Sequence, residues 1–424
     1  MLTINFIKEN KELVLERLSV KNFKNPELIE KVLELDSQRR QIQLKYDNGQ
    51  SEMNSLSKEI GILFKSGKAS DANAAKQKTA DLKEEINTLS EQLSALETEL
   101  RSVLVLIPNV PHTSVPRGHG AEDNAEIRKG GSKPLLPKGA LPHWDLAKKY
   151  DIIDFELGVK LTGAGFPVYK GKGAKLQRAL INFFLNEAEK AGYKEIMPPL
   201  MVNEDSGFGT GQLPDKEGQM YHVDLDNFYL IPTAEVPVTN IYRDVILSSN
   251  DFPIKNTAYT PCFRREAGSY GKDVRGLNRL HQFDKVEIVQ IQHPDKSYET
   301  LEEMVKHVES LVNKLELPYR IIKLCGGDMS FASALTYDFE VFAAAQEKWL
   351  EVSSVSNFES FQANRMKLRF KDANDKKTKL AHTLNGSALA LPRIMASLLE
   401  NNQSEEGILI PEVLVPFTGF KIID

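Results

Sequence analysis

The sequence has few cysteines, no long apolar run and little net charge. Its 424 residues include only two cysteines, Cys262 and Cys325, which lie far apart and fit no CxxC or Cys/His metal spacing. We therefore expect neither a disulfide framework nor a zinc site. No stretch approaches the roughly 20 apolar residues of a membrane span, and the N-terminus lacks the apolar run of a signal peptide. These absences predict a soluble, cytoplasmic protein with no membrane partner.

The overall composition does not identify a nucleic-acid-binding protein. The formal net charge is −5, so an RNA partner would have to be attracted by a local basic patch. Hydrophobic residues make up 41% and charged residues 27%, which is ordinary for a globular protein. A chain of this length should hold more than one domain, with at least one large core.

The N-terminal quarter shows an alternation of apolar residues at spacings of three and four. The first run is Leu28, Val32, Leu35, Ile42, Tyr46, Met53, Leu56, Ile60 and Leu63, and the second is Ala75, Leu82, Ile86, Leu89, Leu93, Leu96, Leu100 and Val103 with Thr79 as a polar member. Only Arg39 and Gly49 interrupt the first run, and a short Ser-Gly break at 65–68 separates the two. This pattern predicts an antiparallel helical hairpin, each arm of about 36 residues spanning about 54 Å.

A two-helix hairpin is too thin to contain its own catalytic cleft, which leaves two interpretations. It could be a dimerisation coiled coil, or an arm for a long, shaped partner such as structured RNA. Residues 1–103 hold 16 Lys/Arg against 17 Asp/Glu, so their overall charge does not decide between the two. The candidate phosphate contacts are the basic residues near the tip and on the second arm: Lys58, Lys65, Lys68, Lys76, Lys78 and Lys83.

The remaining chain, 104–424, reads as a mixed α/β domain that begins with a linker rich in Pro and Gly. A short helix with Trp144 and Leu146 as anchors follows. Residues 174–191 form an amphipathic helix ended by Gly192, and 193–202 a strand interrupted by Pro198-Pro199. Such a strand belongs at a sheet edge or a bulge facing another chain, so this part could form a dimer interface.

The stretch around 263–287 predicts a strand at 260–264, a long loop rich in Gly and Arg, and a second strand at 283–289. It places guanidinium groups beside carboxylates, which suits a ligand that carries both phosphates and an amine. A solvated, salt-bridged hairpin is the alternative. Upstream, the glycine-rich loop 206–214 could lie against a ligand, and an apolar strand delivers Thr233 and Glu235, for which helix capping explains the pattern equally well.

Two further segments carry polar groups at strand ends. Residues 349–357 are expected to form a strand in which Glu351 precedes hydroxyl side chains. A carboxylate beside a hydroxyl supplies hard oxygen ligands that suit Mg²⁺. Residues 382–387 lead into the helix ALALPRIMASLLE, which places Arg393 in its first turns, where an arginine can face an anion.

In order along the chain, these segments resemble the three motifs of class II aminoacyl-tRNA synthetases. Motif 1 is the helix 174–191 with the strand at Pro199, motif 2 is FRREAGSYGKDVRGLNRLHQFDKVE, and motif 3 is LNGSALALPRIM. Together with TGQLP (210–214), PTAEV (232–236) and the N-terminal hairpin, they resemble the bacterial seryl-tRNA synthetases over essentially the whole chain.

The resemblance implies an α+β fold: a tRNA-binding helical arm at 1–103 and, at 104–424, an antiparallel sheet flanked by helices. It implies ATP and Mg²⁺ as cofactors, a homodimer, and tRNA(Ser), with tRNA(Sec), as partners. Arg264 would contact the α-phosphate and Arg393 the γ-phosphate end as catalytic residues. The implied L-serine contacts are Thr233, Ala234, Glu235, Glu287 and Ser387. The implied ATP contacts are Arg264, Arg265, Glu266, Leu280, Glu351, Val352, Ser353 and Ser354, with Glu351 and Ser354 as Mg²⁺ ligands.

Two departures from the family pattern are visible. Motif 3 reads GSALALPR where the family usually has GSGLAVGR, and the residues 215–219 after TGQLP are unusual. The implied activity is ATP-dependent charging of tRNA with serine. The alternatives are a class II homologue that loads another acceptor, a coiled-coil interaction protein with an inactive synthetase-like domain, and another class II specificity such as threonine or proline.

Overall fold

The computed structural model describes residues 1–215, 218–266, 275–373, 375 and 377–424. These form two compact units, one of Met1–Ser19 with Phe23–Pro108 and one of Val20–Asn22 with Asn109–Asp424. The glycine- and serine-containing part of the loop predicted between 263 and 287, at 267–274, lies outside the described residues. No described helix is both long enough and apolar enough to span a membrane.

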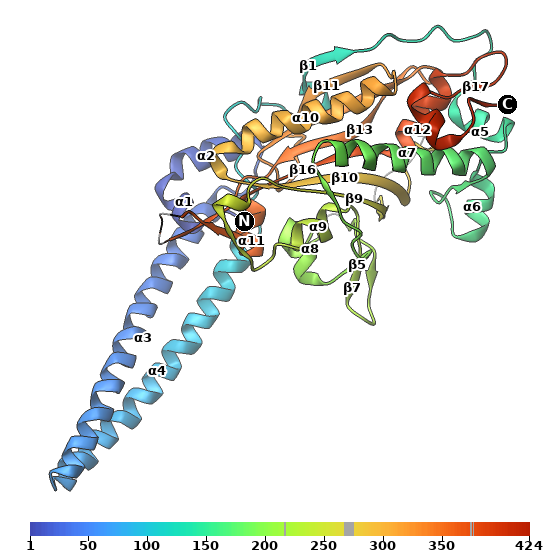
Figure 1. Ribbon diagram of the computed structural model, residues 1–424. Coiled ribbons are helices and arrows are strands. Elements are labelled where there is room, and N and C mark those ends of the chain that lie inside the picture. The colour runs from blue at the N-terminus through green and yellow to red at the C-terminus, as the bar shows by residue number, and fades with distance from the viewer. Residues whose placement is uncertain (216–217, 267–274, 374, 376) are drawn as a thin grey trace. The chain divides into compact units, whose positions relative to one another are not determined.

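The N-terminal unit is built from helices and contains the predicted hairpin. Two short helices, α1 (Ile4–Glu9) and α2 (Lys11–Val20), precede the long antiparallel pair α3 (Glu27–Lys65) and α4 (Ala69–Leu104) (Figure 1). Each member of the two predicted apolar runs is buried or half-buried. The predicted break is confirmed, because the chain turns at 66–68 between the two helices.

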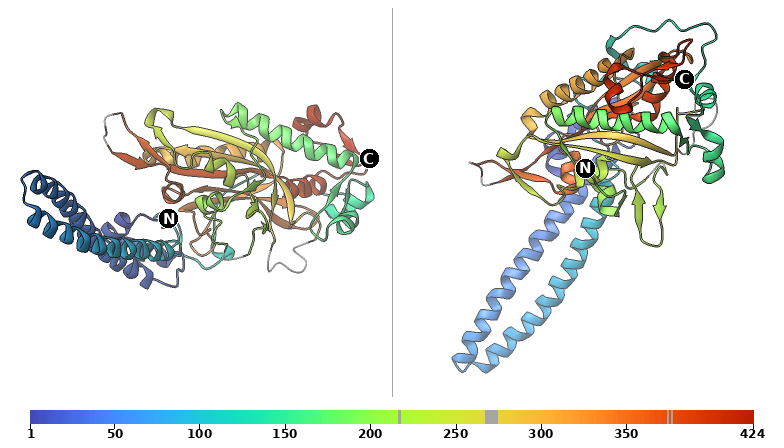
Figure 2. Two further views of the ribbon diagram at one scale, coloured as in Figure 1. Left: turned by 90° about the horizontal axis from the view of Figure 1, so that it is seen from below. Right: turned by 45° about the vertical axis from the view of Figure 1, so that its right-hand side comes forward.

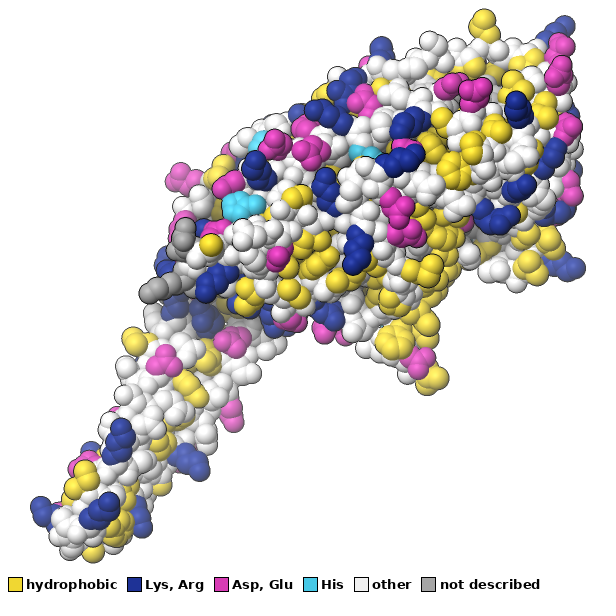
Figure 3. Space-filling view, in the orientation of Figure 1, with side chains coloured by type: hydrophobic (Ala, Val, Ile, Leu, Met, Phe, Trp, Pro, Cys, Tyr) yellow, Lys and Arg dark blue, Asp and Glu magenta, His cyan; other side chains and the backbone are white. Residues whose placement is uncertain are grey.

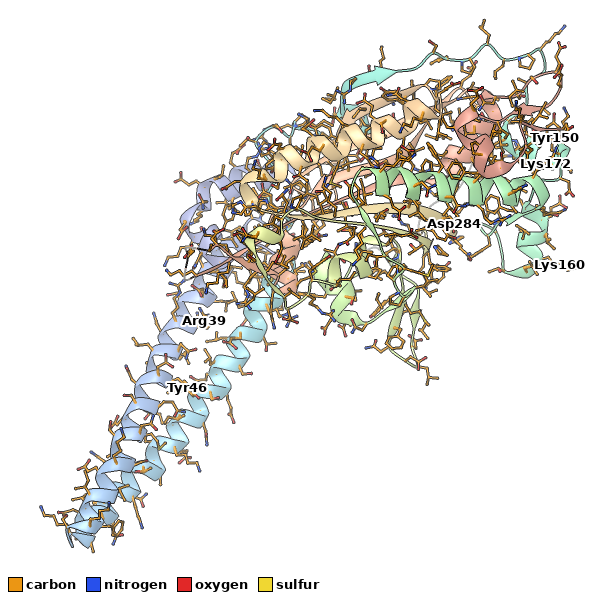
Figure 4. All side chains as sticks on the ribbon, viewed as in Figure 1. Arg39, Tyr46, Tyr150, Lys160, Lys172 and Asp284 are labelled. Carbon is orange, nitrogen blue, oxygen red and sulfur yellow. The ribbon has the colours of Figure 1, made fainter. Side chains whose placement is uncertain are left out.

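Both interruptions of the apolar pattern have a local explanation. Arg39 donates to the buried carboxylate of Asp36 at 2.8 Å, and Arg40 pairs with its other oxygen at 2.6 Å, so the polar group is neutralised inside the seam (Figure 4 labels Arg39 on α3). Gly49 is buried against α4. A Cβ at this position would lie only 3.0 Å from Cγ1 of Ile86, so a larger residue would not fit without a shift. The larger side chain on the opposite helix fills the space that the glycine leaves.

The second unit is organised around an eight-stranded sheet with the order β1-β11-β12-β13-β16-β10-β9-β4. Neighbouring strands are antiparallel except for the β4–β9 pair at one edge. The strands are β1 (Ala125–Gly130), β11 (Tyr319–Lys323), β12 (Leu335–Ala343), β13 (Lys348–Asn357), β16 (His382–Ala390), β10 (Gln282–Gln292), β9 (Ile254–Phe263) and β4 (Lys194–Glu195). The predicted strands at 260–264, 283–289 and 349–357 are therefore confirmed.

The two faces of this sheet are covered by different elements (Figures 1 and 2). Helices α7 (Gly171–Lys190), α10 (Ser297–Lys314) and α12 (Leu391–Asn401) cover one face and enclose the main hydrophobic core, which includes Val286, Ile288 and Phe339. Helices α9 (Glu235–Asn240) and α11 (Phe361–Met366) contact β10 and β16 from the other side. Because side chains alternate along a strand, Lys285 and Glu287 of β10 face away from the core.

Smaller elements surround the sheet. The remaining helices are α5 (His143–Lys149), α6 (Phe155–Leu161), α8 (Glu204–Thr210) and α13 (Val415–Thr418). The remaining strands are β2 (Ile153–Asp154), β3 (Val168–Tyr169), β5 (Met201–Val202), β6 (His222–Val223), β7 (Phe228–Leu230), β8 (Ile246–Ser248), β14 (Arg369–Lys371), β15 (Thr378–Leu380), β17 (Ile408–Leu409) and β18 (Ile422–Ile423).

The interpretation of the segment after residue 104 as a linker is wrong for residues 125–130. They form β1, which pairs with β11 at the edge of the main sheet. Four successive side chains of this strand are exposed and three of them are charged, so the segment has no apolar alternation. An edge strand is held by backbone hydrogen bonds, which leave no mark in the side-chain pattern.

Two other predicted segments are divided differently from the expectation. The strand expected at 193–202 is split by its prolines into β4, at an edge of the main sheet, and β5, in a separate three-stranded sheet with β7 and β6. The loop expected at 206–214 begins as helix α8. Its glycines allow close packing, because a Cβ on Gly207 would lie 2.8 Å from Leu213 and one on Gly209 would lie 2.7 Å from Asn240.

The motif 3 segment also differs from the expectation. Strand β16 continues to Ala390, so α12 begins at Leu391 and not, as expected, at Ala388. Pro392 lies in the first turn of α12, where a missing N–H breaks no helical hydrogen bond. Arg393 is therefore presented by a regular helix start despite the unusual sequence.

Candidate active site

The candidate site lies on the sheet face opposite α7, α10 and α12, where β9, β10 and β16 run side by side. In the antiparallel register, Glu287 of β10 is directly across from Ser387 of β16 and from Ala258 of β9. Directly opposed residues place their side chains on the same face, roughly 5 Å apart. The register therefore joins two predicted serine-binding residues that are 100 positions apart in the sequence.

The buried carboxylate of Glu287 is the centre of the predicted serine pocket. Its Oε2 lies 2.7 Å from Nζ of Lys285 and accepts hydrogen bonds from Thr233 Oγ1 at 3.3 Å and Ser387 Oγ at 3.5 Å. Burying an ionised carboxylate without such partners would cost several kcal/mol. The structure thus places Thr233 and Ser387 each within hydrogen-bonding distance of Glu287.

The hydroxyl of Thr233 also has a backbone partner at the start of α9, whose N-cap residue is Ala234. Oγ1 of Thr233 accepts from the backbone N–H of Glu235 at 3.3 Å. The neighbouring Ala234 is fully buried and packs with Val238 and Ala258. Because the Ala234 side chain faces this cluster, only its backbone could reach a ligand.

Glu235 is a second buried carboxylate, close enough to Glu287 for the two charges to interact. It is 7% exposed, and its Oε1 accepts a hydrogen bond from Gln362 Nε2 at 2.6 Å. Burial, together with repulsion from Glu287, raises the pKa of Glu235 to about 7. A bound ammonium group would be attracted by both carboxylates and would favour the ionised form of Glu235.

The affinity for an amino-acid substrate is therefore expected to fall in mild acid. As the pH decreases through about 7, Glu235 takes up a proton and no longer pairs with the ammonium group, so KM for serine should rise up to about tenfold per pH unit. KM for ATP, measured in the same assays, is the internal control. A KM for serine that stays constant from pH 8 to pH 5.5 would contradict this role.

The same pKa shift has a consequence for stability. The folded-state pKa of Glu235 lies above the ordinary value near 4.5, so ionisation of this group destabilises the folded protein increasingly as the pH rises from there to about 7. Glu235→Gln should raise Tm more at pH 8 than at pH 5, and it should also raise KM for serine.

Two residues that contact these carboxylates, Lys285 and Gln362, are absent from the sequence-based predictions. Lys285 could have been found, because it is two residues from Glu287 on one strand and must share its face. Gln362 had no such signal. It comes from α11, where Thr383 Oγ1 donates to its Oε1 at 2.6 Å and its own amide donates to the carbonyl of Thr210 at 3.1 Å.

We predict that Gln362→Leu raises KM for serine about tenfold and leaves KM for ATP nearly unchanged. The variant removes the donor to Glu235 and the acceptor for Thr383, and each buried group left unpaired costs about 1–3 kcal/mol. Steady-state kinetics of serine-dependent ATP–pyrophosphate exchange would measure the effect. Gln290→Leu is a matched control, because Gln290 is equally buried but hydrogen-bonds Tyr193 on the core side of β10. An equal change of KM for serine in both variants would contradict the prediction.

The predicted nucleotide-binding arginines follow β9. Nε of Arg264 donates to the carbonyl of Pro232 at 3.3 Å, and its guanidinium lies 5.3 Å from the ring centroid of Phe283. Arg264 has no carboxylate partner in the described part of the chain, so these contacts orient the cation without neutralising it. The guanidinium of Arg265 lies 5.7 Å from the ring centroid of Tyr221.

The residues on either side of the undescribed segment 267–274 are tied to each other. Glu266 has a φ of +47° and pairs with Arg279 at 3.1 Å. Leu280 is 5% exposed and belongs to the main hydrophobic core. The expected contacts of Glu266 and Leu280 with ATP stay predictions.

Asp284, at the end of motif 2, serves the fold. It accepts hydrogen bonds from Gln177 of α7 at 2.8 Å and from Tyr259 of β9 at 2.9 Å, and Figure 4 shows it between α7 and the sheet. Asp215, in the unusual segment after TGQLP, accepts from the backbone N–H groups of Gln219 and Met220 at 3.0 and 2.8 Å. These hydrogen bonds tie Asp215 to the backbone at 219–220.

Arg393 is held by two carbonyl oxygens. Its Nε donates to Asn278 at 2.9 Å and its Nη1 to the backbone of Glu351 at 2.7 Å, while the half-exposed carboxylate of Glu351 lies 3.9 Å away. Carbonyl acceptors orient the guanidinium and leave most of its positive charge available to an anion.

A β-bulge brings Glu351 and Ser354 to one face of β13. Ser354 pairs with Asp338 of β12 and Glu351 pairs with Glu340, which leaves Val352 outside the pairing. Without the extra residue, side chains three positions apart would point to opposite faces. The sequence prediction grouped these two residues without a reason for their geometry, and the bulge supplies it.

The other two residues of this predicted ATP-binding segment point away from that face. Val352 belongs to the main hydrophobic core, and Ser353 donates to the carbonyl of Ser387 at 2.5 Å. Any contact of these two with ATP would have to come from their backbone.

Asp338 of β12 is absent from the sequence-based predictions. It is 7% exposed, and its Oδ1 has no hydrogen-bond partner among the described residues. Burial and the charge of Glu351 raise the pKa of Asp338.

Both parts of the chain match known families. Residues 1–111 match the seryl-tRNA synthetase N-terminal domain, and residues 221–402 match the class II tRNA synthetase core domain of the G, H, P, S and T group. A serine–tRNA ligase of Salinibacter ruber is 50% identical over 424 residues, which is 100% of this chain and 99% of that protein. A serine–tRNA ligase of Geobacter sulfurreducens is 44% identical over 99% of each chain.

A solved structure is similar over the same length. Seryl-tRNA synthetase from Pyrococcus horikoshii, crystallised with ATP, has a TM-score of 0.92 at 33% identity and covers 100% of this chain and 99% of its own. With relatives of this identity over the full length and a matching fold, the chain belongs to the seryl-tRNA synthetase (serine–tRNA ligase) family.

Proposed function

We propose that this protein is a serine–tRNA ligase, which activates L-serine with ATP and transfers it to the 3′ end of tRNA(Ser). The observation that carries the proposal is the pair of buried carboxylates Glu235 and Glu287 in a member of this family, at the sheet face that also bears Glu351 and Ser354. The two carboxylates suit the ammonium group of serine, while Arg264 suits the phosphates of ATP. The ATP complex of the similar solved enzyme supports ATP as the substrate.

In the first step the carboxylate of serine attacks the α-phosphate of ATP, and pyrophosphate leaves. The substrate is itself the nucleophile, so no side chain has to form a covalent bond. The residues contribute position and charge: Arg264 would stabilise charge at the α-phosphate and Arg393 at the γ-phosphate end. In the second step a hydroxyl of the tRNA terminus attacks the seryl carbonyl, and AMP leaves.

Selectivity for serine would depend on hydrogen bonds to its hydroxyl group. The hydroxyls of Thr233 and Ser387 both donate to the carboxylate of Glu287 and form a buried polar cluster with it. Alanine would leave these buried groups without a partner, and unpaired buried polar groups discriminate strongly against such an analogue. A larger residue such as threonine would have to fit within the same walls.

The donor set near Glu351 fits a magnesium ion. Carboxylate and hydroxyl oxygens, as in Glu351 and Ser354, are ligands that Mg²⁺ prefers, and the ion usually takes its other ligands from phosphates and water. Within the described ranges, no group of three His, Cys, Asp or Glu side chains could hold a metal ion alone. When bound with ATP, magnesium would neutralise phosphate charge.

We assign tRNA binding to the α3–α4 hairpin, which would grip the long variable arm of tRNA(Ser). The six lysines named as candidate phosphate contacts are all exposed in the structure. Charging of tRNA(Sec) by the same route is a further part of the proposal, as is a cytoplasmic location. Comparing the charging of tRNA(Ser) and tRNA(Sec) transcripts would test whether tRNA(Sec) is a substrate.

We also propose that the protein is a homodimer. Figure 3 shows hydrophobic side chains gathered over the region of β5 and β7. Met197 is 89% exposed beside Pro198-Pro199, and Met201 and Phe228 nearby are 50% and 41% exposed. Exposed apolar groups of this kind mark protein interfaces. Light scattering should give twice the chain mass of 47.7 kDa, and a monomer would contradict the proposal.

The test of the function is ATP–pyrophosphate exchange with each of the twenty amino acids. Exchange that depends on serine, followed by charging of tRNA(Ser), is the expected result. Exchange without tRNA charging would favour a homologue that loads another acceptor, and exchange with a different amino acid would assign another specificity. The absence of exchange with every amino acid would indicate an inactive synthetase-like domain.

A further inference from the structure

A fully buried histidine and glutamate form a pair outside the candidate site. His143 at the start of α5 and Glu400 near the end of α12 are each 0% exposed, and Nδ1 of His143 lies 2.8 Å from Oε1 of Glu400. The same oxygen accepts the backbone N–H of His143 at 3.0 Å. A buried polar pair of this kind is costly to maintain unless its hydrogen bonds are complete.

The other ring nitrogen of the histidine accepts a hydrogen bond from the backbone of motif 2 at Leu277. The backbone N–H of Leu277 donates to Nε2 of His143 at 2.9 Å. An amide can only donate, so Nε2 must be unprotonated and the ring proton is on Nδ1, directed at Glu400. Gly276, with a φ of +67°, lies directly against the ring: a Cβ there would be 2.2 Å from Nε2.

The second oxygen of Glu400 extends the same network. It accepts the backbone N–H groups of Ala345 and Gln346, each at 3.1 Å. The side chain of Gln346 donates to Glu400 at 2.7 Å and accepts from Nδ2 of Asn278 at 2.9 Å. Asn278, the residue after Leu277, is thus fixed from the same buried carboxylate.

The network ends at Arg393. The carbonyl of Asn278 accepts from its Nε at 2.9 Å. Arg393 and Glu400 are seven residues apart on α12, two helical turns, and therefore lie on one side of that helix. Three hydrogen bonds and the peptide bond between Leu277 and Asn278 thus connect Glu400 through His143 to Arg393.

We propose that His143 is a positioning residue for ATP binding: it fixes the Gly276–Asn278 segment, whose carbonyl orients Arg393. The inference rests on the proposed function, since it assumes that Arg393 meets the phosphates of ATP. Loss of the imidazole leaves the Leu277 amide without an acceptor and frees the segment to shift. A displacement of about 1 Å in a positioning element can cost up to a hundredfold in rate.

The experiment compares His143→Leu and His143→Gln in the full-length protein by serine-dependent ATP–pyrophosphate exchange. His143→Leu should raise KM for ATP about tenfold and change KM for serine less than twofold. Glutamine can accept from Leu277 and donate to Glu400, so His143→Gln should recover most of the affinity for ATP. Hydrogen exchange at the Leu277 amide should be faster in His143→Leu than in the wild-type protein.

His307→Leu is the matched control. His307 is a largely buried histidine of α10 whose Nε2 has no hydrogen-bond partner in the described ranges. Its replacement should change KM for ATP less than twofold. Should His143→Leu not fold, Gln346→Leu tests the same path, because Gln346 is only half-buried and joins Glu400 to Asn278. It should raise KM for ATP about threefold.

The outcomes separate this inference from the proposed function. If the wild-type protein shows no serine-dependent exchange, the function itself is wrong and the positioning role falls with it. If the wild-type protein is active but the His143 or Gln346 variants leave KM for ATP unchanged, only the positioning role is overturned. Equal increases of KM for ATP and for serine would also overturn it, because a general loss of structure would affect both substrates.

Discussion

Replacing Arg264 with alanine is expected to abolish serine-dependent ATP–pyrophosphate exchange. The guanidinium is oriented by the carbonyl of Pro232 and the ring of Phe283, and no carboxylate in the described part of the chain neutralises it. We propose that it meets the charge that develops on the α-phosphate as serine attacks. Removing one such donor from an active site typically costs about 10²–10³ in rate, and removing a cation from a phosphoryl-transfer site costs more.

Two further variants sharpen this test. Arg264→Lys keeps the charge but loses the planar fork of donors, so its activity should lie between wild type and Arg264→Ala. Arg128→Ala is the matched control. Arg128 lies on the edge strand β1 and forms a 2.7 Å ion pair with Glu309. This variant should retain nearly full exchange. If Arg264→Ala retained more than a tenth of wild-type kcat/KM for ATP, the assignment of Arg264 to the α-phosphate would be wrong.

Deleting residues 28–103 is expected to separate the two halves of the reaction. The hairpin α3–α4 lies in a different compact unit from the candidate active site, which belongs to the unit of Val20–Asn22 with Asn109–Asp424. The shortened protein, with a brief glycine-serine connection in place of the hairpin, should retain ATP–pyrophosphate exchange. Charging of tRNA(Ser) should fall below detection, because binding of the variable arm is lost.

A full-length variant separates the loss of phosphate contacts from the loss of the whole arm. Replacing the six exposed lysines of the tip and second arm (Lys58, Lys65, Lys68, Lys76, Lys78 and Lys83) with alanine should weaken tRNA binding and reduce its salt dependence. Pyrophosphate exchange should stay at the wild-type rate. Normal charging of tRNA(Ser) by the deletion variant would refute the proposed role of the hairpin.

The sequence predicted the hairpin better than the sheet, because the two depend on interactions of different range. Apolar spacing along α3 and α4 is a local property, and it located the break at 65–68 correctly. The sheet depends on pairing between distant segments. Strand β1 was missed for this reason, since its pairing with β11 uses backbone groups while its side chains are exposed and mostly charged.

The helix α8 was missed for a related reason. Its glycines resemble a flexible loop in the sequence, but they allow α8 to approach Leu213 and Asn240 closely. Glycine residues in a sequence do not reveal whether the backbone adopts a turn there or packs closely against a neighbouring segment. Only the neighbouring segments decide which of these applies.

The side chains of the candidate site could be listed from sequence motifs, but their arrangement could not. By itself the sequence determined which chemical groups are present: the arginines of motif 2, the carboxylates Glu235 and Glu287, and the hydroxyl of Ser387. Tertiary structure decided which of them meet. The antiparallel register sets Glu287 opposite Ser387, and the bulge at Val352 turns Glu351 to the face of Ser354. Lys285, Gln362 and His143 acquire their positions from these distant contacts, because strand register and burial depend on the whole folded chain and not on neighbouring residues.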